Sequence, residues 1–106
     1  LKQGNITFKD IQNNILEHIE DISAGGLKII TNTPLELDKN YSIEISLSNN
    51  MKIDCALRPI RVQKCEFENK SAYEISGKFV DLENVDRIVL VQYTFKIKME
   101  EQNKES

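Results

Sequence analysis

The chain has 106 residues, of which 40% are hydrophobic and 29% are charged, and its formal net charge at pH 7 is −3. These values are typical of one globular domain with a single core, and they exclude a disordered chain. The acidic balance opposes broad attraction to a nucleic-acid polymer or an anionic membrane, so we expect neither as a partner. No apolar run approaches the roughly 18 residues of a spanning helix, so membrane insertion is not expected.

The two ends of the chain predict its domain organisation. It begins with Leu1 rather than Met and shows no secretory signal, so we expect Leu1 to be a cut point within a longer protein. We predict a single domain over residues 1–99. Residues 100–106, "EEQNKES", are polar throughout, and we expect them to form a frayed tail.

Short apolar runs alternate with polar residues and turns up to Val80. The clearest run is residues 41–47, "YSIEISL", whose alternation is typical of a half-buried antiparallel strand. We expect further strands at residues 6–8, 15–22, 27–30, 51–57, 60–67 and 72–80, with turns at 48–50 and 68–71. Pro59 lacks a backbone donor, so it either bends its strand or places it at a sheet edge. Short strands at this spacing predict a closed barrel or a sandwich.

Residues 89–99, "VLVQYTFKIKM", fit two kinds of element. Apolar residues occupy every odd position, which by periodicity alone indicates a strand. A helix is also possible, because Asn and acidic residues precede the segment and lysines gather toward its end, where a helix dipole favours cations. A helix would place on one stripe the side chains of Ile88, Val91, Phe95 and Met99. The pattern alone leaves both alternatives open.

Residues 21–26, "DISAGG", are the most informative stretch of the chain. A tight hairpin needs one glycine or an Asn-Gly pair to reach positive φ. Two adjacent glycines after an acid and a hydroxyl therefore suggest that something approaches the backbone closely. The plain alternative is a tight turn in which Asp21 or Ser23 hydrogen-bonds its own backbone.

The residue types that catalysis needs are scarce. His18 is the only histidine and lies in a strand-like run, so we interpret it as a packed or exposed strand residue and not as a general base. Cys55 and Cys65 lack the spacing of a zinc site, and we expect two reduced thiols in or near strands. There is no glycine-rich phosphate loop and no dinucleotide fingerprint. We predict a protein that is not an enzyme and has no catalytic residue, metal or cofactor.

Three stretches together resemble the PilZ domain, the bacterial receptor module for cyclic di-GMP, in its flagellar-brake-like type. Asp21, Ser23 and Gly26 match the family's second motif, which is Asp or Asn, any residue, Ser, two further residues and Gly. Gly77 and Phe79 in "ISGKFVDL" match a later Gly and Phe, and "DRIVLVQYTFKIKMEE" resembles the family's C-terminal helix. The resemblance covers about residues 15–101.

The resemblance implies both a fold and a ligand. The implied fold is mainly β, a six-stranded antiparallel β-barrel with a C-terminal α-helix. The implied ligand is cyclic di-GMP, bound at Asp21, Ser23, Gly25 and Gly26. In the family the acid and the hydroxyl hydrogen-bond a guanine, and the glycine leaves space for that base against the backbone. The chemistry is sensible, because a carboxylate can accept from the N1 and N2 donors of guanine.

One part of the family pattern is missing from this chain. The family's first motif is a pair of arginines separated by three residues, which stack on guanine and contact phosphates. The arginines here are Arg58, Arg61 and Arg87, and none of them lies near the N-terminus. Lysine is a poor substitute, since it has neither the planar face nor the bidentate fork. Either the pair lies just before Leu1, which we favour, or the domain has lost its ligand.

We therefore predict a cytoplasmic bacterial domain that binds cyclic di-GMP. Its occupancy would pass to another domain of the parent chain or to an effector protein, with motility or exopolysaccharide synthesis as the output. The alternative is a degenerate PilZ domain that binds no nucleotide and serves as an interaction or structural module. The receptor hypothesis requires that Asp21 and Ser23 face outward beside a cleft, and that they do not hydrogen-bond their own main chain.

Overall fold

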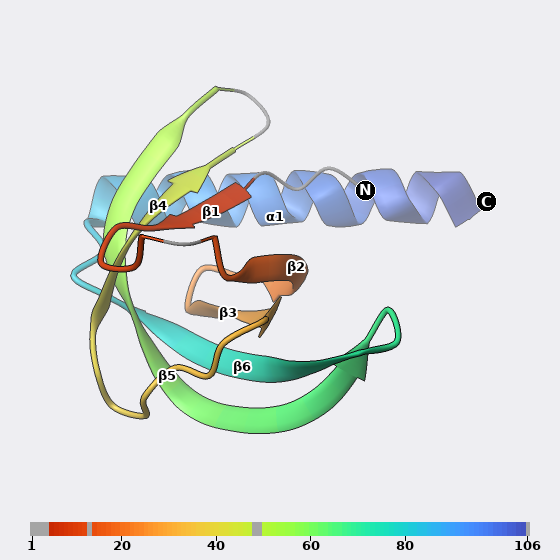
Figure 1. The fold of residues 1–106 in the computed structure, drawn as a ribbon. Coiled ribbons are helices and arrows are strands. Elements are labelled where there is room, and N and C mark those ends of the chain that lie inside the picture. The colour runs from red at the N-terminus through yellow and green to blue at the C-terminus, as the bar shows by residue number, and fades with distance from the viewer. Residues whose placement is uncertain (1–4, 13, 48–49, 106) are drawn as a thin grey trace.

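The computed structural model of the chain describes residues 5–12, 14–47 and 50–105, without the side chains of residues 98 and 100–105. Within these residues it contains six strands and one helix (Figure 1). They are β1 (Asn5–Phe8), β2 (Leu16–Ile22), β3 (Gly26–Thr31), β4 (Tyr41–Ser46), β5 (Lys52–Phe67), β6 (Lys70–Val80) and α1 (Asn84–Glu105).

The strands form one antiparallel sheet in the order β1-β4-β5-β6-β3-β2. The sheet curls into a half-barrel whose edge strands are β1 and β2, and α1 runs beside it (Figure 1). This arrangement confirms the predicted mainly β fold, with six antiparallel strands and a C-terminal helix.

One face of the curled sheet, which we call the inner face, carries the hydrophobic core. In β4 the alternation predicted from the sequence holds, because Tyr41, Ile43 and Ile45 are buried there. Leu27 and Ile29 of β3 lie on the same face. Residues between these positions point to the opposite face, which we call the outer face, because successive side chains of a strand alternate.

Strand β5 is one continuous strand of 16 residues, where the sequence suggested two. Pro59 does not end it. The register with β6 shifts between Pro59 and Arg61, so the proline bends the strand at a bulge. As a whole β5 is a central strand, but its pairing with β4 ends at Leu57, so Pro59 pairs in the sheet with β6 and lies just beyond the last residue that pairs with β4.

Two of the expected turns join long strands. At the first, residues 48 and 49 lie outside the described residues, while the Leu47 N–H donates to the Met51 carbonyl at 2.8 Å and closes the hairpin. At the second, Glu68 and Asn69 have positive φ values of 49° and 65°, the backbone conformation that a two-residue hairpin turn requires.

Residues 84–105 form a helix, which resolves the ambiguity of the C-terminal segment. Leu90 and Tyr93 are buried in the core, so packing on the sheet selects the helix over a further strand. The stripe expected on a helix faces solvent: Ile88, Val91, Phe95 and Met99 are exposed, and Val85 is exposed beside them.

The helix continues through residues 100–105, so their backbone is helical, whereas fraying of this tail stays a prediction. The described residues contain no helix with the length and hydropathy to cross a bilayer.

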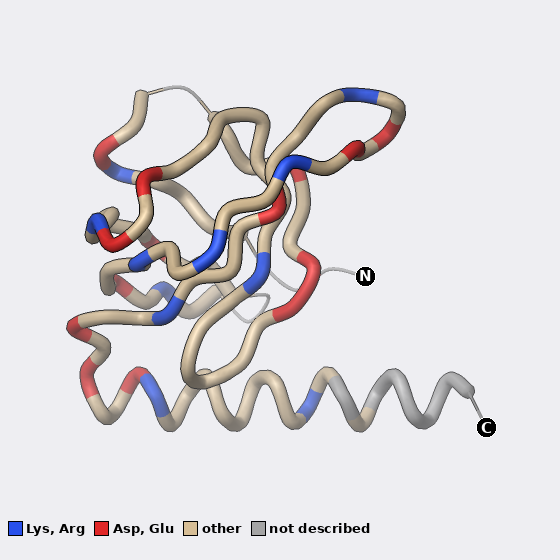
Figure 2. Tube along the Cα trace, turned by 90° about the horizontal axis from the view of Figure 1, so that it is seen from below, with Lys and Arg blue, Asp and Glu red and all other residues tan. Residues whose placement is uncertain are grey.

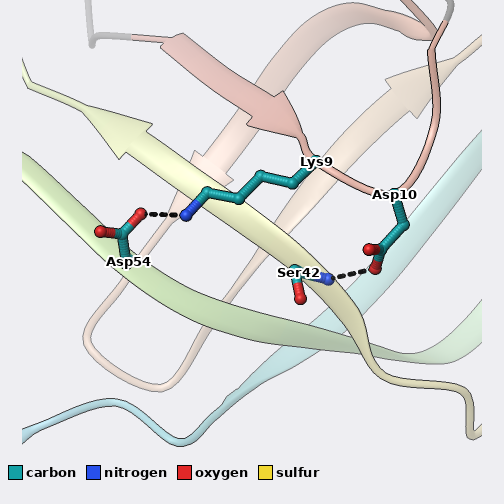
Figure 3. A network of polar contacts seen from close by, with 4 residues as sticks. All are labelled: Lys9, Asp10, Ser42 and Asp54. Carbon is teal, nitrogen blue, oxygen red and sulfur yellow. Dashed lines mark hydrogen bonds and ion pairs between the residues drawn. The ribbon is translucent and has the colours of Figure 1, made fainter.

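Side-chain contacts tie the end of β1 to its neighbours (Figure 3). The Lys9 ammonium pairs with the Asp54 carboxylate on β5, and this hydrogen bond raises the pKa of Lys9. The Ser42 N–H of β4 donates to the Asp10 carboxylate at 2.9 Å. Both members of the Lys9–Asp54 pair are largely exposed, so the pair aligns the strands more than it stabilises the fold.

The two faces of α1 predict opposite effects of truncation. Leu90→Ala removes a fully buried side chain and is expected to lower the free energy of unfolding by about 2–5 kcal/mol. Phe95→Ala, the control, removes a side chain that is 66% exposed and should change it by less than about 0.5 kcal/mol. Urea unfolding followed by circular dichroism measures both. Equal losses would contradict the packing of α1 through the face of Leu90 alone.

Candidate nucleotide-binding site

The "DISAGG" stretch forms the turn between β2 and β3. The backbone N–H of Ser23 donates to the Gly26 carbonyl at 2.9 Å, and the two strands begin to pair at Ile22 and Leu27. Asp21 lies at the end of β2 opposite Lys28, and both are exposed on the outer face. The turn thus presents the Asp21 carboxylate to solvent.

The hydroxyl of Ser23 participates in the turn itself. It accepts from the Gly25 N–H at 3.3 Å and donates to the Gly26 carbonyl at 3.3 Å. The expectation that neither side chain hydrogen-bonds its own main chain is therefore wrong for Ser23. The side chain remains exposed, and a hydroxyl has two lone pairs, so one acceptor position is left for a ligand.

The lack of a side chain has a different consequence at each of the two glycines of the turn. A Cβ on Gly26 would lie 2.2 Å from the Gly77 carbonyl oxygen of β6, so the close neighbour of Gly26 is the protein's own backbone. A Cβ on Gly25 would meet nothing within 4 Å. Gly25 therefore leaves open surface at the turn, whereas Gly26 allows β3 and β6 to approach.

Two further contacts hold the turn from outside. The Phe79 N–H of β6 donates to the Gly25 carbonyl at 3.0 Å, and Arg87 of α1 donates from Nη1 to the Ala24 carbonyl at 2.9 Å. The turn is therefore fixed by β6, by α1 and by its own hydroxyl. Sequence reasoning missed Arg87, because nothing in the spacing of residues 24 and 87 signals their contact.

Two hollows of the surface lie away from this turn. One, of about 290 Å³, is lined by residues of β1 and of the segment that follows it, such as Phe8 and Gln12. The other, of about 160 Å³, is lined by residues near the β5–β6 turn, such as Phe67 and Lys70. No residue of the turn lines either hollow, so the cleft expected beside Asp21 and Ser23 is not one of these two.

The histidine and the cysteines occupy structural positions. His18 is exposed on β2 and stacks on Phe67, with ring centroids 5.4 Å apart, as expected for a strand residue. Cys55 and Cys65 are free thiols on β5. Burial raises the pKa of Cys55 to about 11, with contributions from Asp86 and Asp54, so the thiol stays protonated near neutral pH. Among the described residues, no cluster of potential ligands can hold a metal ion.

Comparison with known proteins supports one family. The family model for the PilZ domain matches residues 2–96, which is most of the chain. Comparisons with curated proteins and with solved structures give no match.

The glycine geometry predicts a contrast between two neighbouring substitutions. Gly26→Ala places a methyl group against the Gly77 carbonyl and should lower the free energy of unfolding by about 1–3 kcal/mol. Gly25→Ala enters open space and should leave the stability unchanged or raise it by up to about 1 kcal/mol. Thermal unfolding of the two variants measures the difference. Equal stability would contradict the close approach of β3 and β6.

The raised pKa of Cys55 predicts slow, strongly pH-dependent alkylation. In a Cys65→Ser variant, the rate with iodoacetamide should rise about tenfold per pH unit through pH 9, because the reactive thiolate is a minor species below a pKa of about 11. Glutathione, the control, approaches its plateau near its ordinary thiol pKa. A plateau for Cys55 near pH 8 would contradict the buried, acid-flanked position of the thiol.

Proposed function

This chain belongs to the PilZ domain family, a family of cyclic di-GMP-binding modules, and from that premise we propose that it is a cyclic di-GMP receptor. The observation that carries the proposal is the exposed carboxylate of Asp21 at a turn held from three sides. A turn already fixed before binding loses little conformational freedom when the ligand arrives.

Each residue of the turn has a proposed role toward the guanine. The Asp21 carboxylate accepts from the N1 and N2 donors of the base, and the remaining lone pair of Ser23 accepts a further hydrogen bond. Gly25 provides the open surface against which the base lies. Gly26 acts indirectly, because its contact with Gly77 positions the turn.

The relay step of the proposal rests on Arg87. This side chain joins the Ala24 carbonyl of the turn to the first turns of α1, so a ligand that changes the turn also changes a contact of the helix. The exposed face of α1 is a surface that another domain of the parent chain or an effector protein can sense. Differential affinity of the ligand for two arrangements of this contact would shift their populations. We propose a bacterial cytoplasmic setting with motility or exopolysaccharide synthesis as output.

The second candidate function is an interaction module that binds no nucleotide. It is favoured by the apolar surface of α1, where Val85, Ile88 and Phe95 are 62%, 57% and 66% exposed. Solvated apolar surface of this kind commonly marks a protein interface. Nucleotide binding distinguishes the two functions.

Isothermal titration calorimetry with cyclic di-GMP tests the receptor function. We expect saturable binding at micromolar concentrations of the full-length protein. Asp21→Ala should weaken it by about 1.5–3 kcal/mol, the range of a charge-assisted hydrogen bond, and Ser23→Ala by about 0.5–1.5 kcal/mol. Glu17→Ala, on the same strand, is the matched control and should bind as the wild type does. Absence of heat with the wild type would reject the receptor in favour of the interaction module.

A further inference from the structure

We propose that Lys28, Arg58, Arg61 and Lys78 form a phosphate-binding surface on the outer face of the sheet, beside the turn of residues 21–26. We call it the cationic surface. It would hold the phosphodiester groups of the dinucleotide while the turn holds a guanine. The identity of the ligand rests on the proposed function, whereas the surface itself rests on the sheet.

The register of the sheet brings these residues together from three strands. In one cross-strand row Lys28 of β3 lies opposite Ser76 of β6, and Ser76 lies opposite Arg61 of β5. In the next row Gly26 lies opposite Lys78, and Lys78 lies opposite Arg58. Neighbouring strands are about 5 Å apart and alternate residues about 7 Å apart, so the four Cα positions fall within about 10 Å by 7 Å.

Both rows reach the candidate site. In the first row, Lys28 lies opposite Asp21 of β2 on the side away from Ser76. The second row ends at Gly26 of the turn. From Asp21 on β2, Lys28 is therefore one strand away, Lys78 two strands away, and the two arginines on β5 three strands away. Figure 2 shows several basic positions close together along neighbouring segments of the chain.

Strand alternation directs the side chains outward. Lys28 lies between the buried Leu27 and Ile29, and it is exposed. Lys78 is likewise exposed, between the buried Gly77 and Phe79. The inner face thus takes the apolar neighbours and the outer face takes the lysines.

The two arginines are oriented by neighbouring amides. Arg58 donates from Nε to the Asn40 side-chain oxygen at 2.8 Å, and Arg61 donates from Nη2 to the Gln63 side-chain oxygen at 2.8 Å. A guanidinium has five N–H donors, so each arginine keeps donors for a phosphate. A held guanidinium also loses less freedom when it binds an anion.

The charge of the cationic surface opposes that of the whole chain. The chain has a net charge of −3, yet the two rows contain four cations and one carboxylate, Asp21. Acidic residues also border these rows: Glu20 lies near Lys28, Glu74 lies near Glu20, and the Asp38 N–H donates to the carbonyl of Pro59, the neighbour of Arg58. Burial and then the charge of Glu74 raise the pKa of Glu20, so these two carboxyls lie close to each other. The local field beside the turn therefore attracts a phosphate although the net charge does not.

Two titrations of the purified protein test the cationic surface. Inorganic pyrophosphate, followed by amide chemical shifts in NMR spectra, reports anion binding without a base, and calorimetry with cyclic di-GMP reports the complete ligand. The test variant is Lys28→Gln with Lys78→Gln. The matched control is Lys52→Gln with Lys70→Gln, which removes the same charge from exposed lysines at the far ends of β5 and β6. Melting temperatures of both should equal that of the wild type.

We expect pyrophosphate to shift the amides around residues 28, 58, 61 and 78. The test variant should weaken both ligands by about tenfold or more, and the control by less than about twofold. Unchanged binding of cyclic di-GMP by the test variant would overturn the cationic surface and leave the receptor function standing. If cyclic di-GMP fails to bind but pyrophosphate still maps to the surface, the receptor function fails and the surface stands. Pyrophosphate shifts that the test variant does not weaken would overturn the surface.

Discussion

The close approach of the backbones of Gly26 and Gly77 is the constraint on which the rest of the site depends. A side chain at Gly26 would overlap the Gly77 carbonyl, and one at Gly77 would press on Leu57. With no side chain at either position, β3 pairs with β6 directly at the turn, and Phe79 can donate to the Gly25 carbonyl. The position of the turn and the register of the outer face therefore follow from the same contact.

Register explains how an acidic chain can present a basic surface. Charged residues spread along the sequence from Asp21 to Lys78 become neighbours because four strands pair at fixed positions. The inner face carries the apolar core, so Lys28 of β3 and Lys78 of β6, which lie between buried residues, point the other way. A net charge averages over this separation of faces and does not describe the field that a bound ligand would meet.

Helix α1 links the turn to a second surface. One face packs Leu90 and Tyr93 into the core, and the other leaves Ile88 and Phe95 in solvent. Arg87, near its start, holds the Ala24 carbonyl. A helix with two apolar faces is suited to a domain that packs on its own sheet and on something else, and the arginine connects that function to the site. This arrangement suits both a receptor and an interaction module.

The sequence by itself determined the strands, because alternation of apolar and polar residues is a local pattern that follows from the geometry of a strand. It also determined the turn at residues 21–26 and, through the resemblance, the fold, which the structure confirms. Only the tertiary structure decided that Pro59 bends a central strand, that residues 89–99 are helical and that Ser23 hydrogen-bonds its own turn. It alone placed Arg87 on the turn and the four cations in two rows. These features depend on which strands become neighbours, and residues far apart in the chain carry no local signal of the partners they will have.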